Sequence, residues 1–268
     1  MSTLPSSTKL AFLAPEHEEI VAHIQEAHRP LFDFVHRLTV LAHEVLIDAK
    51  VNRSDLQQLL LASLEHKALT AFQAIVILVE RGLSSEARIV LRTLLEVTFR
   101  IVAIAKDKDV GIAYVLEDQV HRKKFIDKHK KLSDEVRNEA SDAIRDDLQS
   151  TIAQNIKDKD IKELKTSWFA QNAGMMDFYN SAYAVLSGSV HVNVRSLESA
   201  LQLDEDENII GLSYGPSDED LEIHIVTACE ALILSLLAVH SIVDKTFDKQ
   251  LNSFYEELKS LLTVRHAT

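Results

Sequence analysis

Residues 84–105 read SSEARIVLRTLLEVTFRIVAIA, and this stretch decides the fold class. It contains no Gly or Pro and is apolar on almost every side, which is the pattern of a helix buried inside a bundle. Ser84 or Ser85 offers an N-cap, and the charged residues from Asp107 to Asp109 end the pattern. We therefore expect a long central helix against which the other helices pack.

The scarcity of turn residues extends this interpretation to the whole chain. Six Gly and four Pro in 268 residues are too few for the turns of an all-β domain or for the Gly-rich turns of a doubly wound α/β domain. With 46% hydrophobic and 26% charged residues, the composition is that of a globular protein. The sequence predicts an all-α, multi-helix bundle.

Caps and breakers on either side of the central stretch predict the other helices. Pro30 should interrupt a helix over about residues 16–47, and Asp55 or Ser54 should cap a long helix that ends at Gly82. We expect further helices around residues 121–131, from Ser133 onward, over about 176–190, over 217–243 and from there to the end of the chain.

Residues 201–215 break the helical rhythm. Asn208, Gly211 and Gly215 surround the apolar segment IIGLSY, which predicts a short β-hairpin or an extended insertion. We expect residues 1–14 to form a flexible N-terminal tail and residues 15–268 to form a single helical domain. The charged stretch 157–165 is the best candidate for a division of that domain into two layers.

The net charge of −12 argues against a surface that binds nucleic acid or anionic membrane throughout. The charge is segregated, however, because residues 121–131 (HRKKFIDKHKK) hold six basic residues and one acid, whereas residues 204–222 hold eight acids and no Lys or Arg. RNA would meet the chain at the basic run. The residues concerned are Arg122, Lys123, Lys124, Lys128 and His129. The alternative is a solvated helix face, or one that pairs with the acidic turn.

The single cysteine, Cys229, excludes an intrachain disulfide and a Cys-based metal cluster, and its apolar surroundings predict a buried thiol. We expect no metal and no cofactor. The N-terminus lacks the pattern of a signal peptide. Residues 225–243 are long enough to span a membrane but carry Glu230 and His240, so we expect a core helix of a soluble, cytoplasmic protein.

Charged residues recur at every fourth position of the central stretch, at Arg88, Arg92, Glu96 and Arg100. Residues four apart share one face of a helix, and buried charges are costly unless they are paired or reach a cavity. One interpretation is an anion site, because the guanidinium fork suits phosphate and carboxylate. The other is an internal ladder in which Arg92 and Arg100 clamp Glu96.

A second polar stripe, Tyr179, Tyr183, Ser187 and His191, also steps by four. If that helix continues through Gly188, the two stripes converge. His191 would then act as general acid or base, with Arg92 and Glu96 as its catalytic partners. The ligand-binding candidates are Arg88, Tyr183 and Ser187. In the alternative, the tyrosine rings pack in the core and His191 caps a helix end.

These two motifs, with Gly215 and Pro216 before a last apolar helix, resemble a bacterial helical family of unknown function over residues 60–245. The resemblance implies a helical fold and a shared polar cluster, and it brings no established activity. The implied cluster comprises Arg88, Arg92, Glu96, Tyr183, Ser187 and His191.

More distantly, the chain resembles the HEPN ribonucleases of toxin and phage-defence systems, whose mark is an Arg followed by a His on one helix. Matching spacings run from Arg29 to His36, from Arg37 to His43 and from Arg122 to His129. This resemblance implies RNA cleavage without metal, in which the Arg positions the phosphate and the His transfers the 2′-hydroxyl proton. The His191 segment departs from the pattern, because Arg195 follows the His.

Two hypotheses for function remain open. The first is an RNA-cleaving or RNA-binding effector of a toxin or phage-defence system, with an antitoxin or another partner protein. The second is a non-enzymatic helical module whose cluster holds a small anionic ligand or only fixes the fold. The apolar stretch 59–64 (LLLASL) favours a homodimer in either case.

Overall fold

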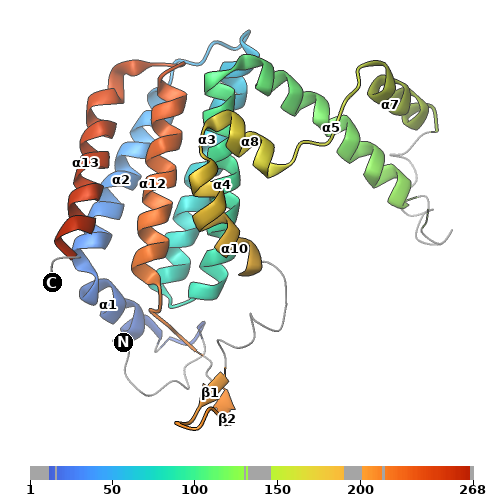
Figure 1. Ribbon diagram of the computed structural model, residues 1–268. Coiled ribbons are helices and arrows are strands. Elements are labelled where there is room, and N and C mark those ends of the chain that lie inside the picture. Colours follow the sequence, from blue (N-terminus) through green and yellow to red (C-terminus); the bar gives the residue numbers. More distant parts are fainter. Residues whose placement is uncertain are drawn as a thin grey trace.

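The computed structural model describes residues 12–15, 17–129, 131, 146–189, 201–212 and 215–265, and these form a helical bundle with one small hairpin (Figure 1). The all-α prediction is confirmed. The helices of the bundle are α1 (His17–Ala27), α2 (Arg29–Asp48), α3 (Leu56–Glu80), α4 (Ser84–Lys106), α8 (Thr166–Ala173), α12 (Leu221–His240) and α13 (Asp248–Arg265).

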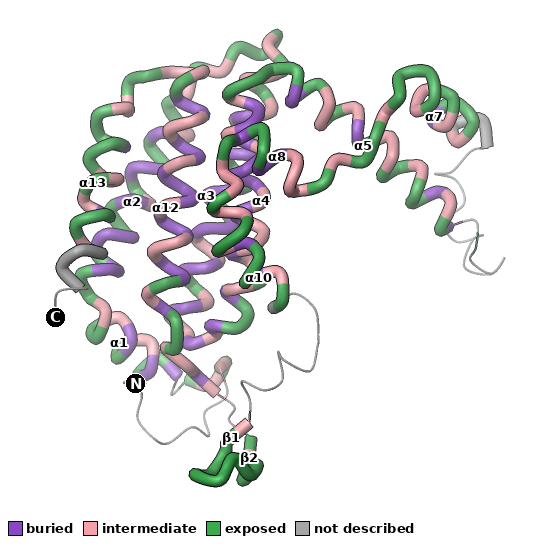
Figure 2. Tube along the Cα trace, viewed as in Figure 1, coloured by how far each residue is buried: buried purple, intermediate pink, exposed green. Residues whose placement is uncertain are grey.

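Helix α4 occupies the centre of the bundle, as its sequence predicts. It packs against α3, α12 and α8, and buried side chains such as Leu91, Leu95 and Phe99 lie along its length. Figure 2 shows the same concentration of buried residues along α3, α4 and α12. Most of the buried hydrophobic residues lie on these three helices. Burial of each large apolar side chain stabilises the folded state by about 1.5–3 kcal/mol.

The predicted boundaries of α3 are confirmed. The Asp55 carboxylate accepts hydrogen bonds from the backbone N–H groups of Gln57 and Gln58, which otherwise lack partners in the first turn. Beyond the C-terminus, Gly82 adopts a left-handed conformation with φ of 71°. Its carbonyl accepts a hydrogen bond from the N–H of Ser217 at 2.9 Å, so the turn after α3 also holds the segment that leads into α12.

Helix α5 (Lys108–His129) leaves the bundle and projects as an arm against which α7 (Asp146–Asp158) packs (Figure 1). The Glu117 carboxylate accepts a hydrogen bond from the N–H of Leu164 at 2.7 Å and thereby fastens the returning chain to the arm.

The predicted division of the domain into two layers at residues 157–165 stays a prediction. The helix predicted from Ser133 lies outside the described residues, and so does most of the predicted N-terminal tail.

The helix predicted over residues 176–190 is present with a local change of winding. α9 (Met176–Phe178) continues into a π-helical turn, η2 (Tyr179–Tyr183), and then into α10 (Ala184–Ser189). The sequence contains no breaker that predicts this π turn.

The predicted hairpin is confirmed as a two-stranded antiparallel ribbon of β1 (Leu201–Leu203) and β2 (Ile209–Leu212). It projects beyond the end of the bundle where α3 ends and α4 begins (Figure 1). Between α12 and α13 lies a short 3-10 turn, η3 (Lys245–Phe247).

Helices α3 and α12 are long and apolar enough to span a membrane by length and composition alone. Half or more of the most apolar window of each is buried inside the bundle, as for core helices. Cys229 on α12 is buried, as predicted.

Candidate functional site

The charged stripe on α4 forms the ladder that its spacing predicts. Arg92 Nη1 lies 3.0 Å from one oxygen of Glu96, and Arg100 Nη1 lies 3.8 Å from the other. Arg100 also donates to the Glu96 backbone carbonyl at 2.9 Å, and its guanidinium lies 4.8 Å from the centre of the Phe169 ring. Arg100 is therefore fixed within the bundle, while Arg92, with 26% of its side chain exposed, faces the outside more openly.

Tyr183 links the two predicted stripes. Its hydroxyl accepts a hydrogen bond from Arg92 Nη2 at 2.8 Å and donates one to Glu96 at 2.9 Å. The Arg92 guanidinium also lies 5.0 Å from the centre of the Tyr183 ring, a cation–π distance. The phenol thus sits between a cation and a carboxylate, and Tyr183 is only 6% exposed.

Ser187 completes the contact between α4 and α10. Arg92 Nε donates to the Ser187 hydroxyl at 3.4 Å, and that hydroxyl donates to the Tyr183 carbonyl at 2.8 Å. All three nitrogens of the Arg92 guanidinium therefore have a protein acceptor, and the Nη groups each keep a second hydrogen. The predicted convergence of Arg92, Glu96, Tyr183 and Ser187 is observed.

Arg88 forms a neighbouring cluster one turn toward the start of α4. It forms an ion pair with Asp220, and its Nε donates to His224 Nε2 at 3.2 Å. Burial, reinforced by the charge of Arg88, lowers the pKa of His224 to about 4. His224 is thus neutral at physiological pH, with Nε2 as acceptor and the proton on Nδ1, a buried atom that has no hydrogen-bond partner among the described residues.

Asp220 and His224 are site residues that the sequence analysis missed. They are four residues apart at the start of α12, so they follow the same period-four rule as the other two stripes. This spacing of four residues is the feature of the sequence that could have identified them as site residues. It was obscured because Asp220 belongs to a run of acids that reads as a helix N-terminus.

The catalytic role predicted for His191 stays a prediction, because His191 lies outside the described residues. Among the residues that the structure does describe, no group of three or more His, Cys, Asp or Glu side chains is arranged to hold a metal ion.

The basic run lies on the outer half of the α5 arm, away from helices α4 and α10, which carry Arg92 and Ser187 (Figure 1). Its cations pair with nearby acids: Arg122 with Asp118, Lys123 with Asp127, and Lys124 with Glu163. The idea that these cations pair with the acidic turn at residues 218–222 is therefore wrong. Local acids neutralise much of the charge that RNA would meet.

His129 differs from its predicted role at an RNA-binding surface. It is buried, with 8% exposed, and its ring stacks on Phe125 at a centroid distance of 6.3 Å. Lys128, the remaining predicted RNA contact, lies beside it in the last turn of α5.

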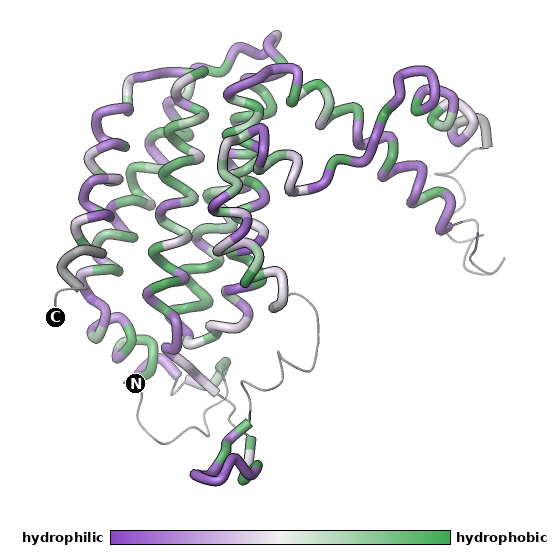
Figure 3. The backbone as a smooth tube through the Cα atoms, viewed as in Figure 1, coloured by the Kyte–Doolittle hydropathy of each residue, from purple (hydrophilic) through white to green (hydrophobic). Residues whose placement is uncertain are grey.

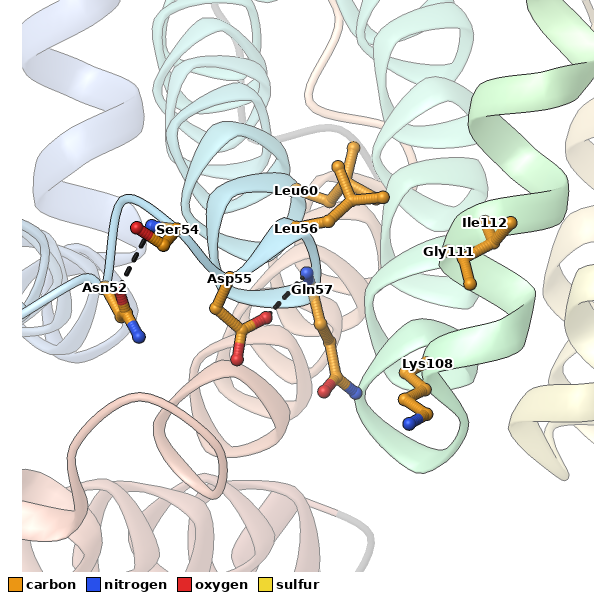
Figure 4. A pocket seen from close by; sticks show the side chains of 9 residues that line it. All are labelled: Asn52, Ser54, Asp55, Leu56, Gln57, Leu60, Lys108, Gly111 and Ile112. Carbon is orange, nitrogen blue, oxygen red and sulfur yellow. Dashed lines mark hydrogen bonds between the residues drawn. The ribbon is translucent and has the colours of Figure 1, made fainter.

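A separate cavity of ≈ 400 Å³ lies between the first turns of α3 and α5 (Figure 4). Asn52, Asp55 and Lys108 line its polar side, while Leu60 and Ile112 form part of its apolar wall. The Asp55 carboxylate at its edge is committed to capping α3. None of the predicted site residues lines this cavity.

Comparison with protein families matches residues 58–209 of the chain to a family of unknown function, DUF5677. Comparison with curated proteins finds no match, and comparison with solved structures finds none either. The matched segment contains Arg88, Arg92, Glu96, Tyr183 and Ser187, whereas Asp220 and His224 lie beyond it.

Proposed function

The chain belongs to this family of unknown function, DUF5677, and we propose from that premise that it is a helical module that binds a small anionic ligand at Arg92. The ligand class is a compound that carries a phosphate or a carboxylate group. The observation that carries the proposal is the position of Tyr183, whose buried hydroxyl is held between Arg92 and Glu96 at the end of a π-helical turn.

The charge balance of the cluster supports an anion. Arg92 and Arg100 share the single carboxylate of Glu96, which leaves a net charge of +1 on these three residues. Arg88 and Asp220 form a neutral pair, and His224 is uncharged because its pKa is lowered to about 4. The cluster is therefore a cationic spot on a chain whose net charge is −12.

The π turn supports a functional role over a purely structural one. π-helical turns are rare and are found most often at functional sites, because the wider turn costs hydrogen-bond quality. Here the turn ends at Tyr183, the residue that joins α10 to the Arg ladder. A ladder that only fixed the fold would need Arg92, Glu96 and Arg100 on an ordinary α-helix, without this distortion.

The RNA hypothesis uses the same Arg92 but draws less support. RNA binding depends on unpaired Lys and Arg side chains that neutralise RNA phosphates and release the counterions of the RNA. Arg122, Lys123 and Lys124 already have acidic partners. A phosphate backbone would have to displace those acids. A small anion needs only the spare Nη hydrogens of Arg92.

The test is thermal unfolding of the full chain with increasing inorganic phosphate and, separately, with citrate as a carboxylate. A ligand that binds only the folded state stabilises it by RT ln(1 + [L]/Kd), so the melting temperature should rise with concentration. Arg92→Gln should abolish the rise, and Arg92→Lys should weaken it because the fork is lost. Arg29→Gln is the matched control, since Arg29 is an exposed arginine paired with Glu26.

An equal response of the wild type and Arg92→Gln to both anions contradicts the proposal, as does no response at all. Total RNA forms a separate arm of the experiment. If the wild type degrades the RNA and neither Arg92→Ala nor His191→Ala does, the result would favour the ribonuclease hypothesis instead.

A further inference from the structure

The cavity between the first turns of α3 and α5 is separate from the proposed anion site, because no residue of the Arg92 cluster lines it. Its volume of ≈ 400 Å³ lies within the range of about 300–1,000 Å³ that is usual for small-molecule sites. Two of the described residues that line it are charged, Asp55 and Lys108, and their charges are opposite. The lining therefore has no net charge.

One wall of the cavity is aliphatic. Leu56 and Leu60 on α3 and Ile112 on α5 form this wall, and Leu56 is 45% exposed and Ile112 46%. Figure 3 shows that α5 is hydrophobic over the part that leaves the bundle and mostly hydrophilic farther along the arm. An aliphatic group that entered the cavity would remove the exposed apolar surface of this wall from water, which favours binding.

Gly111 allows α5 to lie close to α3 beside this wall. Gly111 is buried, and a Cβ added there would lie 3.2 Å from Leu60 Cδ1 and 3.3 Å from Ile104 Cγ2. A glycine inside a helix destabilises it relative to alanine, so a reason in the packing is expected. The close approach of α5 to Leu60 supplies that reason, and it fixes the spacing of the two helices that form the cavity.

The polar side of the cavity holds hydrogen-bonding atoms that the protein leaves unused. Both cap hydrogen bonds to Asp55 end on Oδ1, which leaves Oδ2 without a partner among the described residues. Gln57 Nε2 donates to the Ile104 carbonyl at 2.6 Å, so the amide is fixed with Oε1 as an unused acceptor. Figure 4 shows the side chains of Asp55, Gln57 and Lys108 extending to the same side of the cavity, away from Leu60.

Asp55 and Lys108 do not pair with each other, although they line the same cavity and have opposite charges. Lys108 has no ion-pair partner among the described residues. Asp107 and Asp109 flank it in the sequence but do not line the cavity, and Asp107 accepts a hydrogen bond from the N–H of Asp109. The cavity thus offers one cation and one carboxylate to a ligand that carries both charges.

We propose that this cavity binds a free aliphatic α-amino acid such as leucine. The ligand carboxylate accepts a hydrogen bond from Lys108 Nζ, and the ligand ammonium donates to Asp55 Oδ2 and Gln57 Oε1. The ligand side chain packs against the aliphatic wall. A zwitterion is the ligand class because the lining holds one charge of each sign, whereas the cationic cluster at Arg92 favours an anion. The inference is independent of the anion site.

The test is isothermal titration calorimetry of the full chain with L-leucine and two analogues. 4-Methylpentanoate lacks the ammonium group, and 3-methylbutylamine lacks the carboxylate. Leucine should bind with a Kd below about 1 mM, as expected for a ligand of its size. Each analogue should bind about tenfold or more weakly, because one charge-assisted hydrogen bond is lost and a charge of the protein stays unpaired.

Two substitutions separate the roles of the two charges. Lys108→Met removes the cation, so it should weaken the binding of leucine and 4-methylpentanoate about tenfold or more without weakening that of 3-methylbutylamine. Asp55→Asn keeps an N-cap acceptor for α3 and should have the reverse effect on the two analogues. Lys67→Met is the matched control, since Lys67 is exposed on α3 and does not line the cavity.

An absence of leucine binding at millimolar concentration overturns the proposal. Equal leucine affinities of the wild type and Lys108→Met also overturn it, as does an analogue that binds as tightly as leucine. Arg92→Gln should bind leucine as the wild type does, so failure of the anion-site proposal and failure of this one are distinguishable. Because Lys108 is exposed in the first turn of α5, an unchanged melting temperature is expected for Lys108→Met and confirms that the variant is folded.

Discussion

Glu65 on α3 and His240 at the end of α12 form an ion pair in which neither side chain has any exposed surface. His240 Nε2 lies 3.3 Å from a Glu65 carboxylate oxygen, and Nδ1 donates to the carbonyl of Asp244 at 2.8 Å. Burial alone would lower the pKa of His240, but the hydrogen bond and charge of Glu65, with the Asp244 carbonyl, outweigh it and raise the pKa.

The raised pKa predicts how the pair stabilises the fold at different pH. The folded chain holds the His240 proton more tightly than the unfolded chain, so the contribution is complete below about pH 6.5 and is lost as the pH rises through the folded pKa. His240→Gln should lower the free energy of unfolding by about 3–5 kcal/mol at pH 6 and by less at pH 9, measured by urea denaturation. His36 is an exposed histidine near Glu80, so His36→Gln should lower the free energy of unfolding by less than about 0.5 kcal/mol at both pH values.

His224, on the same helix as His240, should have the opposite pH dependence. Burial and Arg88 lower its pKa to about 4, so the unfolded chain binds more protons between pH 4 and the ordinary value of about 6.5. Its stabilising contribution is complete above that range and is lost as the pH falls through it. The wild type should therefore lose more stability between pH 7 and pH 4.5 than His224→Gln does in parallel urea titrations. Equal losses would show that His224 has the same pKa in the folded and the unfolded chain, which contradicts the prediction.

Gly82 should tolerate no side chain. Its φ of 71° is strained for other residues, and an added Cβ would lie 2.7 Å from the Pro216 Cβ. Gly82→Ala should lower the free energy of unfolding by about 2–4 kcal/mol. Gly188→Ala is the control, because no neighbouring atom lies within 4 Å of the added Cβ and the position is helical. It should stabilise the chain by about 0.5–1 kcal/mol in the same calorimetric melts.

Cys229 should react with thiol reagents only after the bundle opens. It is fully buried on α12, and burial raises the pKa of its thiol well above the usual range. The thiolate is the reactive form, so labelling by a disulfide reagent at pH 8 should be slow in buffer and accelerate with urea in step with unfolding. Rapid labelling in buffer would mean that α12 is accessible in the folded state.

The sequence was sufficient for local features whose causes are local. Asp55 predicts the start of α3 because its carboxylate satisfies two N–H groups of its own first turn, and Gly82 predicts the end because few other residues accept a positive φ. Polar residues at every fourth position placed Arg92 and Tyr183 each on a polar face of its own helix, which predicted that the two could meet.

Features that depend on packing between distant elements could not be predicted in this way. His129 lies in a run of cations, and nothing in that pattern predicts that only 8% of it is exposed. His224 lies in an apolar stretch, and only the crossing of α4 and α12 gives it Arg88 as a partner. In the basic run, Arg122 and Lys123 pair with acids four residues away on the same helix, but Lys124 meets Glu163 only because the chain returns to the arm.

The π turn at Tyr179–Tyr183 makes the candidate site sensitive to chain length. Such a turn holds about one more residue than an α turn, so deleting a single residue there would restore a regular helix. Everything after the deletion would rotate by about 100° relative to the segment before it. Relatives of this chain that lack the extra residue would keep the bundle and lose the meeting of Tyr183 with Arg92. If Arg92 binds an anion as proposed, an indel of one position would thus separate relatives that bind it from relatives that do not, within one fold.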